Sequence, residues 1–214
     1  MLPAMRLEIM SNFSRLARQS ARKITAFLGM FGALLAWPAH GENALKDAVI
    51  LIIRHAEKNE NDNQLAPEGQ ARAQAYVKYF LEFPVDGQPL KLDSLFAASD
   101  SKKSSRPRLT LEPLSQATKL PLNCRYKDKE PEKLAAKLAS KEHGKNILVC
   151  WRRGEIPQLL RALGADPGAL LPGGEWPEHV FNWVVMLRYD GQGHLLPAQC
   201  KRINEHLLPG DGVQ

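Results

Sequence analysis

Two continuous apolar runs constrain the fold of this 214-residue chain more than any other feature. AVILIIR, residues 48–54, is apolar until its last residue, and NILVCW, residues 146–151, repeats the pattern. Both lack the alternation of a strand that has one face in water, so they predict central strands buried on both faces. A sheet of this kind needs helices on each side.

Helical segments alternate with the strands along the chain. PEGQARAQAYVKYFLE, residues 67–82, begins with a proline and an acid and spaces Ala73, Tyr76, Val77 and Phe80 along one helical face. Further helices are predicted within residues 106–120, 131–142 and 154–164, and further strands at residues 93–100, 121–126, 180–190 and 194–203, the last two as a pair around a DGQG turn. The alternation predicts an α/β fold: a three-layer, doubly wound, mostly parallel sheet with helices on both faces.

The basic charge is concentrated at the N-terminus. The chain is 44% hydrophobic and 24% charged with a net charge of +6, which fits a globular protein. Residues 1–41 hold five basic residues and one acid, which leaves 24 basic against 22 acidic residues in 42–214, a net charge of +2. We therefore expect no nucleic-acid partner.

Residues 1–41 have the design of a leader. Arginines precede the apolar run ITAFLGMFGALLAW, and small residues follow near a cleavage point after Gly41. This pattern predicts a secretory signal peptide and a periplasmic or secreted domain at 42–214. An uncleaved membrane anchor and an Arg- and Ser-rich organellar transit peptide are the alternatives, and only the leader would contact a membrane.

Three cysteines, Cys124, Cys150 and Cys200, allow at most one internal disulfide. Cys150 lies within NILVCW and is expected to be a small buried residue. No CxxC pair or histidine-rich spacing is present, so we expect no metal site built on cysteine.

Cations follow three of the predicted strands. Arg54 and His55 end the first strand, Arg106 begins the helix after the second, and Arg152 and Arg153 follow NILVCW. Parallel strands bring their carboxyl ends to one edge of the sheet, where ligands bind in this architecture. Helix starts and guanidinium groups both favour anions, so these residues predict a pocket for a phosphoryl group.

Three motifs resemble those of the histidine phosphatase superfamily, which includes cofactor-dependent phosphoglycerate mutases and many phosphatases. LIIRHAEK resembles its Arg-His signature, and Arg106 and Thr110 in SSRPRLTLEPL match its second motif. LAPEGQARAQA resembles the start of its first helix, through Leu65, Gly69, Arg72 and Ala73. The resemblance implies a phosphoglycerate mutase-like fold.

The resemblance also implies a mechanism without a cofactor or metal. His55 would attack phosphorus to form a phosphohistidine, while Arg54 and Arg106 clamp the phosphoryl oxygens. The partner would be a small phosphorylated substrate or inorganic phosphate. A proton donor for the leaving group is also needed, and the candidates are Glu57, Asp128, Glu130 and Glu155.

The chain departs from the family pattern after the fourth strand. The family carries a second histidine there, usually followed by glycine, whereas this chain reads NILVCWRRGE. Alignment on Gly154 and the following helix places Arg153 at that position, and alignment on the strand places Trp151 there. We prefer Arg153, which keeps a positive donor for phosphate but does not exchange protons near neutral pH.

The leading hypothesis is a phosphatase that hydrolyses a phosphomonoester, with reduced or altered activity. The alternative is a noncatalytic phosphate-binding or protein-interacting member of the same fold. Among the tryptophans, we expect Trp151 to line the pocket, Trp176 to lie on a flexible rim and Trp183 to pack in the core.

Overall fold

A six-stranded sheet forms the centre of the domain in the computed structural model, which describes residues 45–59, 61–140 and 145–212. The predicted leader lies outside the described residues. The strands, in their order across the sheet, are β5 (Leu122–Asn123), β4 (Ser94–Ala97), β6 (Asn146–Trp151), β1 (Val49–Arg54), β7 (Trp183–Arg188) and β8 (Lys201–Asn204).

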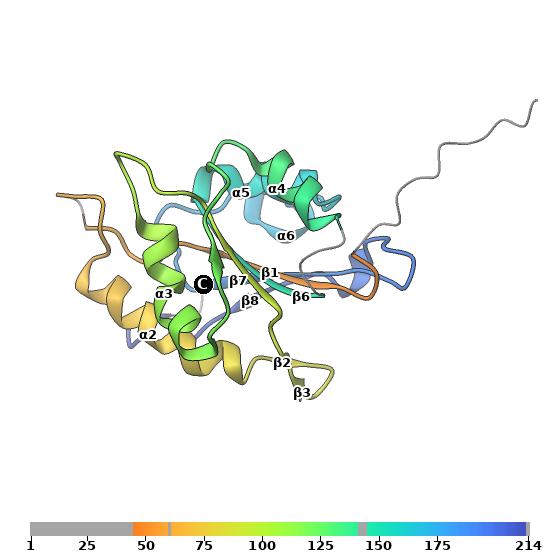
Figure 1. The fold of residues 1–214 in the computed structure, drawn as a ribbon, viewed down its shortest axis with the longest axis horizontal. Coiled ribbons are helices and arrows are strands. Elements are labelled where there is room, and N and C mark those ends of the chain that lie inside the picture. Colours follow the sequence, from red (N-terminus) through yellow and green to blue (C-terminus); the bar gives the residue numbers. More distant parts are fainter. Residues whose placement is uncertain (1–44, 60, 141–144, 213–214) are drawn as a thin grey trace, which may run out of the picture. The chain divides into compact units, whose positions relative to one another are not determined.

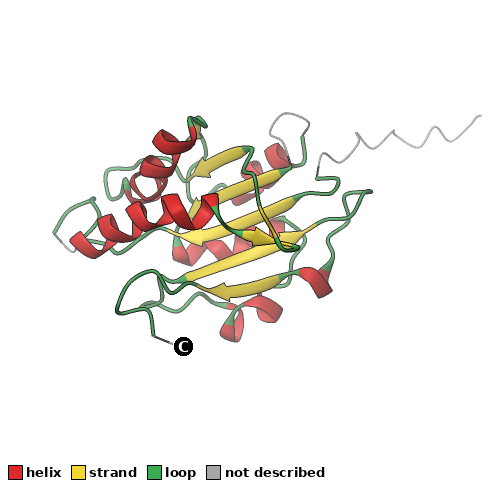
Figure 2. Cartoon of the chain, turned by 90° about the horizontal axis from the view of Figure 1, so that it is seen from below, coloured by secondary structure: helices red, strands yellow, loops and turns green. Residues whose placement is uncertain are grey.

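The sheet is mostly parallel and lies between two layers of helices. β5, β4, β6 and β1 pair in parallel, and β7 runs antiparallel to both of its neighbours. One face carries α2 (Pro67–Leu81) and α3 (Arg106–Thr118), and the other carries α4 (Pro131–Leu138), α5 (Ile156–Ala162) and α6 (Pro167–Leu170) (Figures 1 and 2). This three-layer arrangement confirms the predicted fold class.

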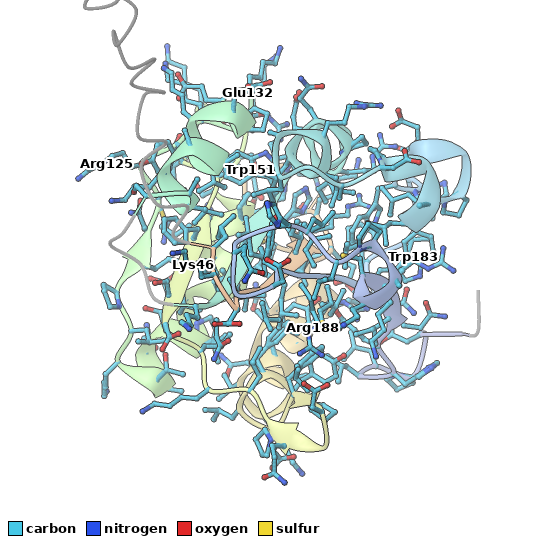
Figure 3. All side chains as sticks on the ribbon, turned by 90° about the vertical axis from the view of Figure 1, so that its right-hand side faces the viewer. Lys46, Arg125, Glu132, Trp151, Trp183 and Arg188 are labelled. Atoms are coloured by element: carbon cyan, nitrogen blue, oxygen red, sulfur yellow. The ribbon has the colours of Figure 1, made fainter. Side chains whose placement is uncertain are left out.

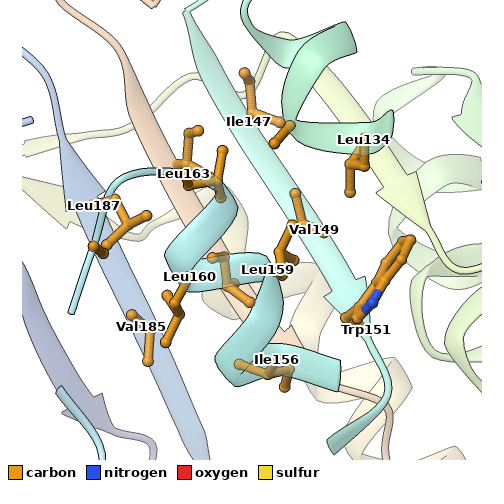
Figure 4. Close-up of a cluster of buried hydrophobic side chains, with 14 of the residues drawn as sticks. Leu134, Ile147, Val149, Trp151, Ile156, Leu159, Leu160, Leu163, Val185 and Leu187 are labelled. Carbon is orange, nitrogen blue, oxygen red and sulfur yellow. The ribbon is translucent and has the colours of Figure 1, made fainter. Parts of the chain in front are cut away.

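Successive side chains of a strand point to opposite faces of the sheet, so alternate residues enter different cores. In β1, Val49, Leu51 and Ile53 pack with α2 and α3, while Ile50 and Ile52 pack with α4, α5 and α6. All six residues of β1 are buried, as the continuous apolar run predicts. The second core is drawn in Figure 4, where the apolar side chains of α5 face the strands.

The helices begin where the sequence places proline in their first turn. Pro67 opens α2 and Pro157 lies early in α5, because proline lacks the N–H that has no partner there and has a helical φ. The predicted apolar face of α5 is buried throughout. In α2, Tyr76 and Phe80 are buried as expected, but Val77 is only half-buried.

Several elements differ from the predicted boundaries. The strand expected within 121–126 covers only Leu122–Asn123, and the 3-10 turn at Pro197–Gln199 delays β8 until Lys201. A short hairpin, β2 (Pro84–Val85) and β3 (Gln88–Pro89), was not predicted. Asp86 and Gly87 form its two-residue turn, with φ of 52° and 78°. Asp-Gly favours such a turn, so the sequence did contain its signal.

The tryptophans are all buried in the described part of the chain. Trp183 packs in the core as predicted, but Trp151 and Trp176 also lie in that core, which corrects the expected pocket and rim positions. Figure 3 shows Trp151 and Trp183 inside the domain, whereas Arg125 and Glu132 lie at its surface. The reason is hydrogen bonding: each indole of Trp151 and Trp176 donates to a main-chain carbonyl, and this makes complete burial possible.

All three cysteines have free thiols, and Cys150 is buried in β6 as predicted. Within residues 45–59, 61–140 and 145–212, no helix is long and apolar enough to cross a bilayer. The same residues contain no cluster of three His, Cys, Asp or Glu side chains that could hold a metal.

β1 and β6 form the point of the sheet where strand order reverses. The chain leaves β1 toward α2 on one face and leaves β6 toward α5 on the opposite face. These diverging connections open a space beyond the carboxyl ends of the two strands. Arg54 and Trp151 are paired at that edge, so the residues that follow them enter the same space.

Candidate active site

A cavity of about 240 Å³ lies at the carboxyl edge of β1 and β6. Its walls come from loops after three parallel strands and from the segment that leads into β7. The lining residues are Arg54, His55, Lys58, Arg106, Arg152, Arg153, Gly154 and Glu178. The fold therefore brings together all four residues that the sequence assigned to catalysis or phosphate binding.

The imidazole of His55 is buried and held by main-chain groups. Its Nδ1 lies 2.8 Å from the carbonyl oxygen of Ala56, and its main-chain N–H donates to the carbonyl of Trp151 at 3.1 Å. Because a carbonyl oxygen only accepts, Nδ1 carries the proton in this contact. The lone pair of the neutral ring is then on Nε2.

The environment of His55 keeps the ring neutral. Burial lowers its pKa to about 3, and the charges of Arg54, Arg106 and Arg152 act in the same direction. The side chain is only 6% exposed. An uncharged imidazole with a free lone pair is the form that attacks an electrophile.

Arg54 fixes the loop that leads into β7. Its Nη1 donates to the carbonyl oxygens of Pro177, Glu178 and Val180 at 3.4, 2.6 and 2.8 Å. The guanidinium carbon lies 3.6 Å from the centre of the Phe181 ring. Burial and the nearby charge of Arg153 lower the pKa of Arg54 to about 10, which still leaves it charged at neutral pH.

One polar atom of Arg54 remains available within this packed arrangement. Its Nε is buried and has no hydrogen-bond partner among the described residues. An unpaired buried N–H costs about 1–3 kcal/mol of stability, so it is an unusual feature in a folded protein. An acceptor entering the cavity beside His55 would remove this cost.

Arg106 lies at the first position of α3 and contacts the loop after β1. Its Nε donates to the carbonyl of Gln64 at 3.0 Å, and its Nη2 donates to that of Asp62 at 2.7 Å. Thr110, one turn later, accepts from the main-chain N–H of Ala56 at 3.0 Å and donates to the carbonyl of Arg106 at 2.8 Å. The threonine of the second motif thus joins the start of α3 to the residue after His55.

Arg152 and Arg153 follow β6 and begin a 3-10 turn, Arg153–Glu155, before α5. Both are partly exposed and both line the cavity. Arg152 forms an ion pair with Asp128, while Arg153 lies 3.8 Å from the carboxylate of Glu178. The structure therefore places both arginines in the wall of the cavity that contains His55.

Arg72 holds Glu57 away from the cavity that contains His55. The Nε of Arg72 lies 3.0 and 3.1 Å from the two carboxylate oxygens of Glu57, and its Nη2 lies 2.7 Å from Oε1. Glu57 lines a separate cavity with Arg72 and Phe181. The first of the four candidate acids is therefore fully engaged in an ion pair.

The other three candidate acids also lie outside the cavity that contains His55. Asp128 and Glu155 line a neighbouring cavity, and Asp128 is paired there with Arg152. Glu130 lines neither cavity and accepts from Lys133 at 2.7 Å at the start of α4. Proximity in the sequence to a cationic loop did not identify the carboxylate that lines the cavity with His55.

Glu178 is the carboxylate that sequence reasoning missed. Among the described residues, it is the one acidic side chain that lines the cavity with His55. Two contacts fix its segment: the Glu178 carbonyl accepts from Arg54, and the indole of buried Trp176 donates to the carbonyl of Val180 at 2.8 Å. The tryptophan expected on a flexible rim instead anchors the rim.

Comparisons with known proteins identify the fold. No model of a known protein family matches the sequence, and no curated protein matches it. Solved structures do match. A phosphoglycerate mutase from Plasmodium falciparum is 20% identical with a TM-score of 0.51, and the match covers 78% of this chain and 97% of that protein. A protein from Escherichia coli assigned as an alpha-ribazole-5′-P phosphatase is 15% identical with a TM-score of 0.51, over 79% and 100% of the two chains. This chain has the phosphoglycerate mutase-like α/β fold of these two structures.

A buried arginine, Arg72, supports the loop after His55. Arg72 contacts Glu57, and its Nη1 and Nη2 also bind the carboxylate of Asp211 at 2.9 and 2.6 Å. Gly69, one turn earlier in α2, passes so close to Glu57 that a Cβ would lie 2.3 Å from its carbonyl oxygen. Gly69 and Arg72 of the LAPEGQARAQA motif therefore both hold the loop that follows His55 in place.

A third carboxylate, from Glu205, lies 3.5 Å from Arg72 at the centre of the domain. Burial raises the pKa of Glu205 to about 8, and Tyr76 donates its hydroxyl proton to Glu205 at 3.1 Å. Asp211 already shares the charge of Arg72. Glu205 is consequently held mainly in its protonated form at neutral pH. It follows β8 at the edge of the sheet where β1 ends, but it does not line the cavity that contains His55.

Proposed function

We propose that this protein is a phosphatase that hydrolyses a phosphomonoester through a phosphohistidine at His55. The observation that carries the proposal is the buried neutral imidazole of His55, with Nδ1 bound to a carbonyl, in a cavity lined by four arginines. Guanidinium groups bind phosphoryl oxygens and balance their charge. Hydrolysis of a phosphate ester through a phosphohistidine needs both a neutral imidazole and cations that bind the phosphoryl oxygens.

In the first step, Nε2 of His55 attacks phosphorus and the bond from phosphorus to the ester oxygen breaks. Arg54, Arg106 and Arg153 bind the nonbridging oxygens and hold the phosphoryl group in line. Glu178, when protonated, gives its proton to the departing oxygen, which leaves as an alcohol. Glu178 supports this role because its carboxylate lines the cavity with His55.

In the second step, water attacks phosphorus and the bond from phosphorus to Nε2 breaks. The carboxylate of Glu178 accepts a proton from the water, and inorganic phosphate leaves. His55 returns to the neutral form with its Nδ1 proton on the carbonyl of Ala56. The cycle consumes one water molecule and needs no other reactant.

The fold supports this assignment because two solved structures that share it are a phosphoglycerate mutase and an assigned alpha-ribazole-5′-P phosphatase. Hydrolysis is preferred over a mutase reaction because the segment between β5 and α4, residues 124–130, is too short to form a cap over the cavity. The substrate class is accordingly stated as a phosphomonoester.

Arg153 is expected to reduce the rate. It supplies charge where the family uses a histidine, but it keeps its proton near neutral pH and is longer than imidazole. Loss of one well-placed donor to a developing anion typically costs about 100-fold to 1,000-fold in turnover. We therefore propose binding of phosphate with slow hydrolysis.

A noncatalytic phosphate-binding or protein-interacting role is the second candidate. One observation favours it: Arg153 lies 3.8 Å from the carboxylate of Glu178, so this carboxylate is engaged in an ion pair within the protein. In that case the cavity would bind phosphate without turnover.

One experiment separates the two roles. The full-length protein and its Arg153→His variant are incubated with 4-nitrophenyl phosphate from pH 4 to 9, and turnover and an acid-labile phosphoryl adduct are measured. Turnover by the native protein, lost in His55→Asn, supports the phosphatase. No turnover and no adduct in the native protein, with both gained in Arg153→His, would make this chain a binder.

A further inference from the structure

A second, larger cavity of about 540 Å³ adjoins the cavity that contains His55. The two share Arg152 and Gly154 as lining residues. The further walls of the second cavity are Ser101, Lys102, Lys103, Asp128, Lys129 and Glu155. A ligand whose phosphoryl group lies beside His55 can therefore extend past Arg152 into this space, which we call the lysine cavity.

The wall between the cavities is built from anchored groups. Buried Trp151 donates its indole N–H to the carbonyl of Asp128 at 2.9 Å, and the carboxylate of Asp128 pairs with Arg152. The Asp128 charge is thus neutralised within the protein. Arg152 is held at the boundary, where it faces both spaces.

The lysines of this cavity are exposed and unpaired in the described part of the chain. Lys102 and Lys103 come from the loop between β4 and α3, and Lys129 comes from the loop between β5 and α4. None of the three forms an ion pair with a residue in 45–59, 61–140 or 145–212. Their ammonium groups remain available to an anion.

The net charge of the domain is unevenly distributed, with the positive charge concentrated around the two cavities. The two cavities together are lined by eight cationic side chains and three carboxylates, a net charge of +5. Residues 42–214 carry a net charge of only +2, so the remainder of the domain is net negative, at −3. Focused positive potential of this kind raises the local concentration of polyanions.

One phosphoryl group does not account for both cavities. It fits the space of about 240 Å³ beside His55, where arginines already surround it, and the lysine cavity then still holds unmatched positive charge. We infer that the substrate is a small phosphomonoester whose alcohol part carries a second phosphate, which binds to Lys102, Lys103 and Lys129 in the lysine cavity. This inference rests on the proposed phosphatase function and narrows its substrate class.

The test uses pairs of esters that differ in one phosphate. Straight-chain diols of two to six carbons are prepared as monophosphates and as bisphosphates, and kcat/KM is measured for each with the full-length protein. We expect the bisphosphate to be preferred at one optimal chain length, since a second phosphate helps only when it reaches the lysines. Equal kcat/KM for both esters at every length would overturn the inference.

Variants test whether the three lysines cause the preference for bisphosphates. Replacing Lys102, Lys103 and Lys129 together by alanine should lower the bisphosphate preference roughly tenfold, or about 1.4 kcal/mol, since each exposed pair contributes about 0.5 kcal/mol. The rate with monophosphates should change little. The matched control replaces Lys78, Lys91 and Lys201 by alanine. These substitutions remove the same amount of charge near the opposite edge of the sheet. An equal loss in both triple variants would mean that only net charge matters and would also overturn the inference.

A binding measurement separates failure of this inference from failure of the proposed function. Protection from thermal unfolding is measured with inorganic phosphate and with each diol ester. Protection by phosphate together with a greater effect of bisphosphates supports the lysine cavity, even if turnover is absent. Protection by phosphate without any added effect of the second phosphate contradicts the lysine cavity alone, and no protection by any of them contradicts the phosphate site itself.

Discussion

The Nη1 atom of Arg54 lies 2.6 Å from the carbonyl oxygen of Glu178. These residues are far apart in the sequence, yet one hydrogen bond ties the residue before the proposed nucleophile to the residue that supplies the nearest carboxylate. Arg54 therefore has a structural role in addition to its proposed role as a phosphate ligand. It sets the distance between the two groups that the proposed reaction needs.

Arg54→Lys should lower both activity and stability. Lysine keeps the charge but cannot reach three carbonyls while also lying over Phe181, so the loop before β7 would lose its attachment. We expect kcat/KM for 4-nitrophenyl phosphate to fall about 100-fold and the free energy of unfolding to fall by about 2 kcal/mol. Arg188→Lys, at a surface pair with Asp86, is the control and should change neither quantity appreciably. Full activity in Arg54→Lys would contradict this role.

If Glu178 is the proton donor, the loss of rate in Glu178→Gln should depend on the leaving group. A poor leaving group needs a proton, whereas 4-nitrophenolate departs without one, so alkyl phosphates should lose about 100-fold in rate while 4-nitrophenyl phosphate changes little. The measurement is kcat/KM across aryl and alkyl esters of increasing leaving-group pKa. Glu175→Gln is the matched control, because Glu175 is exposed in the same loop but does not line the cavity. A uniform loss for all esters would exclude Glu178 as the donor.

Thr110→Val should destabilise the loop that holds His55. Valine has the same shape but leaves the N–H of Ala56 buried without its acceptor, which costs about 1–3 kcal/mol of unfolding free energy. Chemical denaturation measures this loss, and a parallel loss of turnover is expected because Ala56 also binds Nδ1 of His55. Thr110→Ser retains the hydroxyl and should keep most of both properties; a serine variant as defective as valine would point to packing instead.

The buried His55 should make stability depend on pH. Its pKa is about 3 in the folded protein and about 6.5 when unfolded, so the unfolded chain alone takes up this proton between those values. The stabilisation from a neutral His55 is complete above pH 6.5 and decreases as the pH falls. Between pH 7.5 and 5, the native protein should lose about 2 kcal/mol more unfolding free energy than His55→Asn. Equal losses in the two proteins would show that His55 titrates normally in the fold.

The central sheet could be predicted because a buried strand is recognisable from its own residues alone. A strand such as Val49–Arg54 has to be apolar on both faces, and this requirement is visible without knowledge of its partners. The positions of Arg54, His55, Arg106 and Arg153 followed from the same argument, since parallel strands end at one edge.

The proposed proton donor, Glu178, could not be predicted from a local pattern in the sequence. Glu178 lies in a segment without helical or strand periodicity, and its place depends on hydrogen bonds from Arg54 and on burial of Trp176. Neither contact leaves a pattern in the sequence. Glu57 illustrates the opposite case: its short distance from His55 along the chain suggested a role, but Arg72 binds it outside the cavity.

The contacts of Arg72 have a consequence for the order in which the site is assembled. Arg72 joins Glu57, in the loop after His55, to Asp211, which is among the last described residues to be synthesised. During translation, Arg54, His55, Arg106 and Arg153 all emerge from the ribosome before this clamp can close. The nascent chain would therefore carry all four of these residues before the loop after His55 is held in place, and the proposed site would be complete only once the segment around Asp211 has been made.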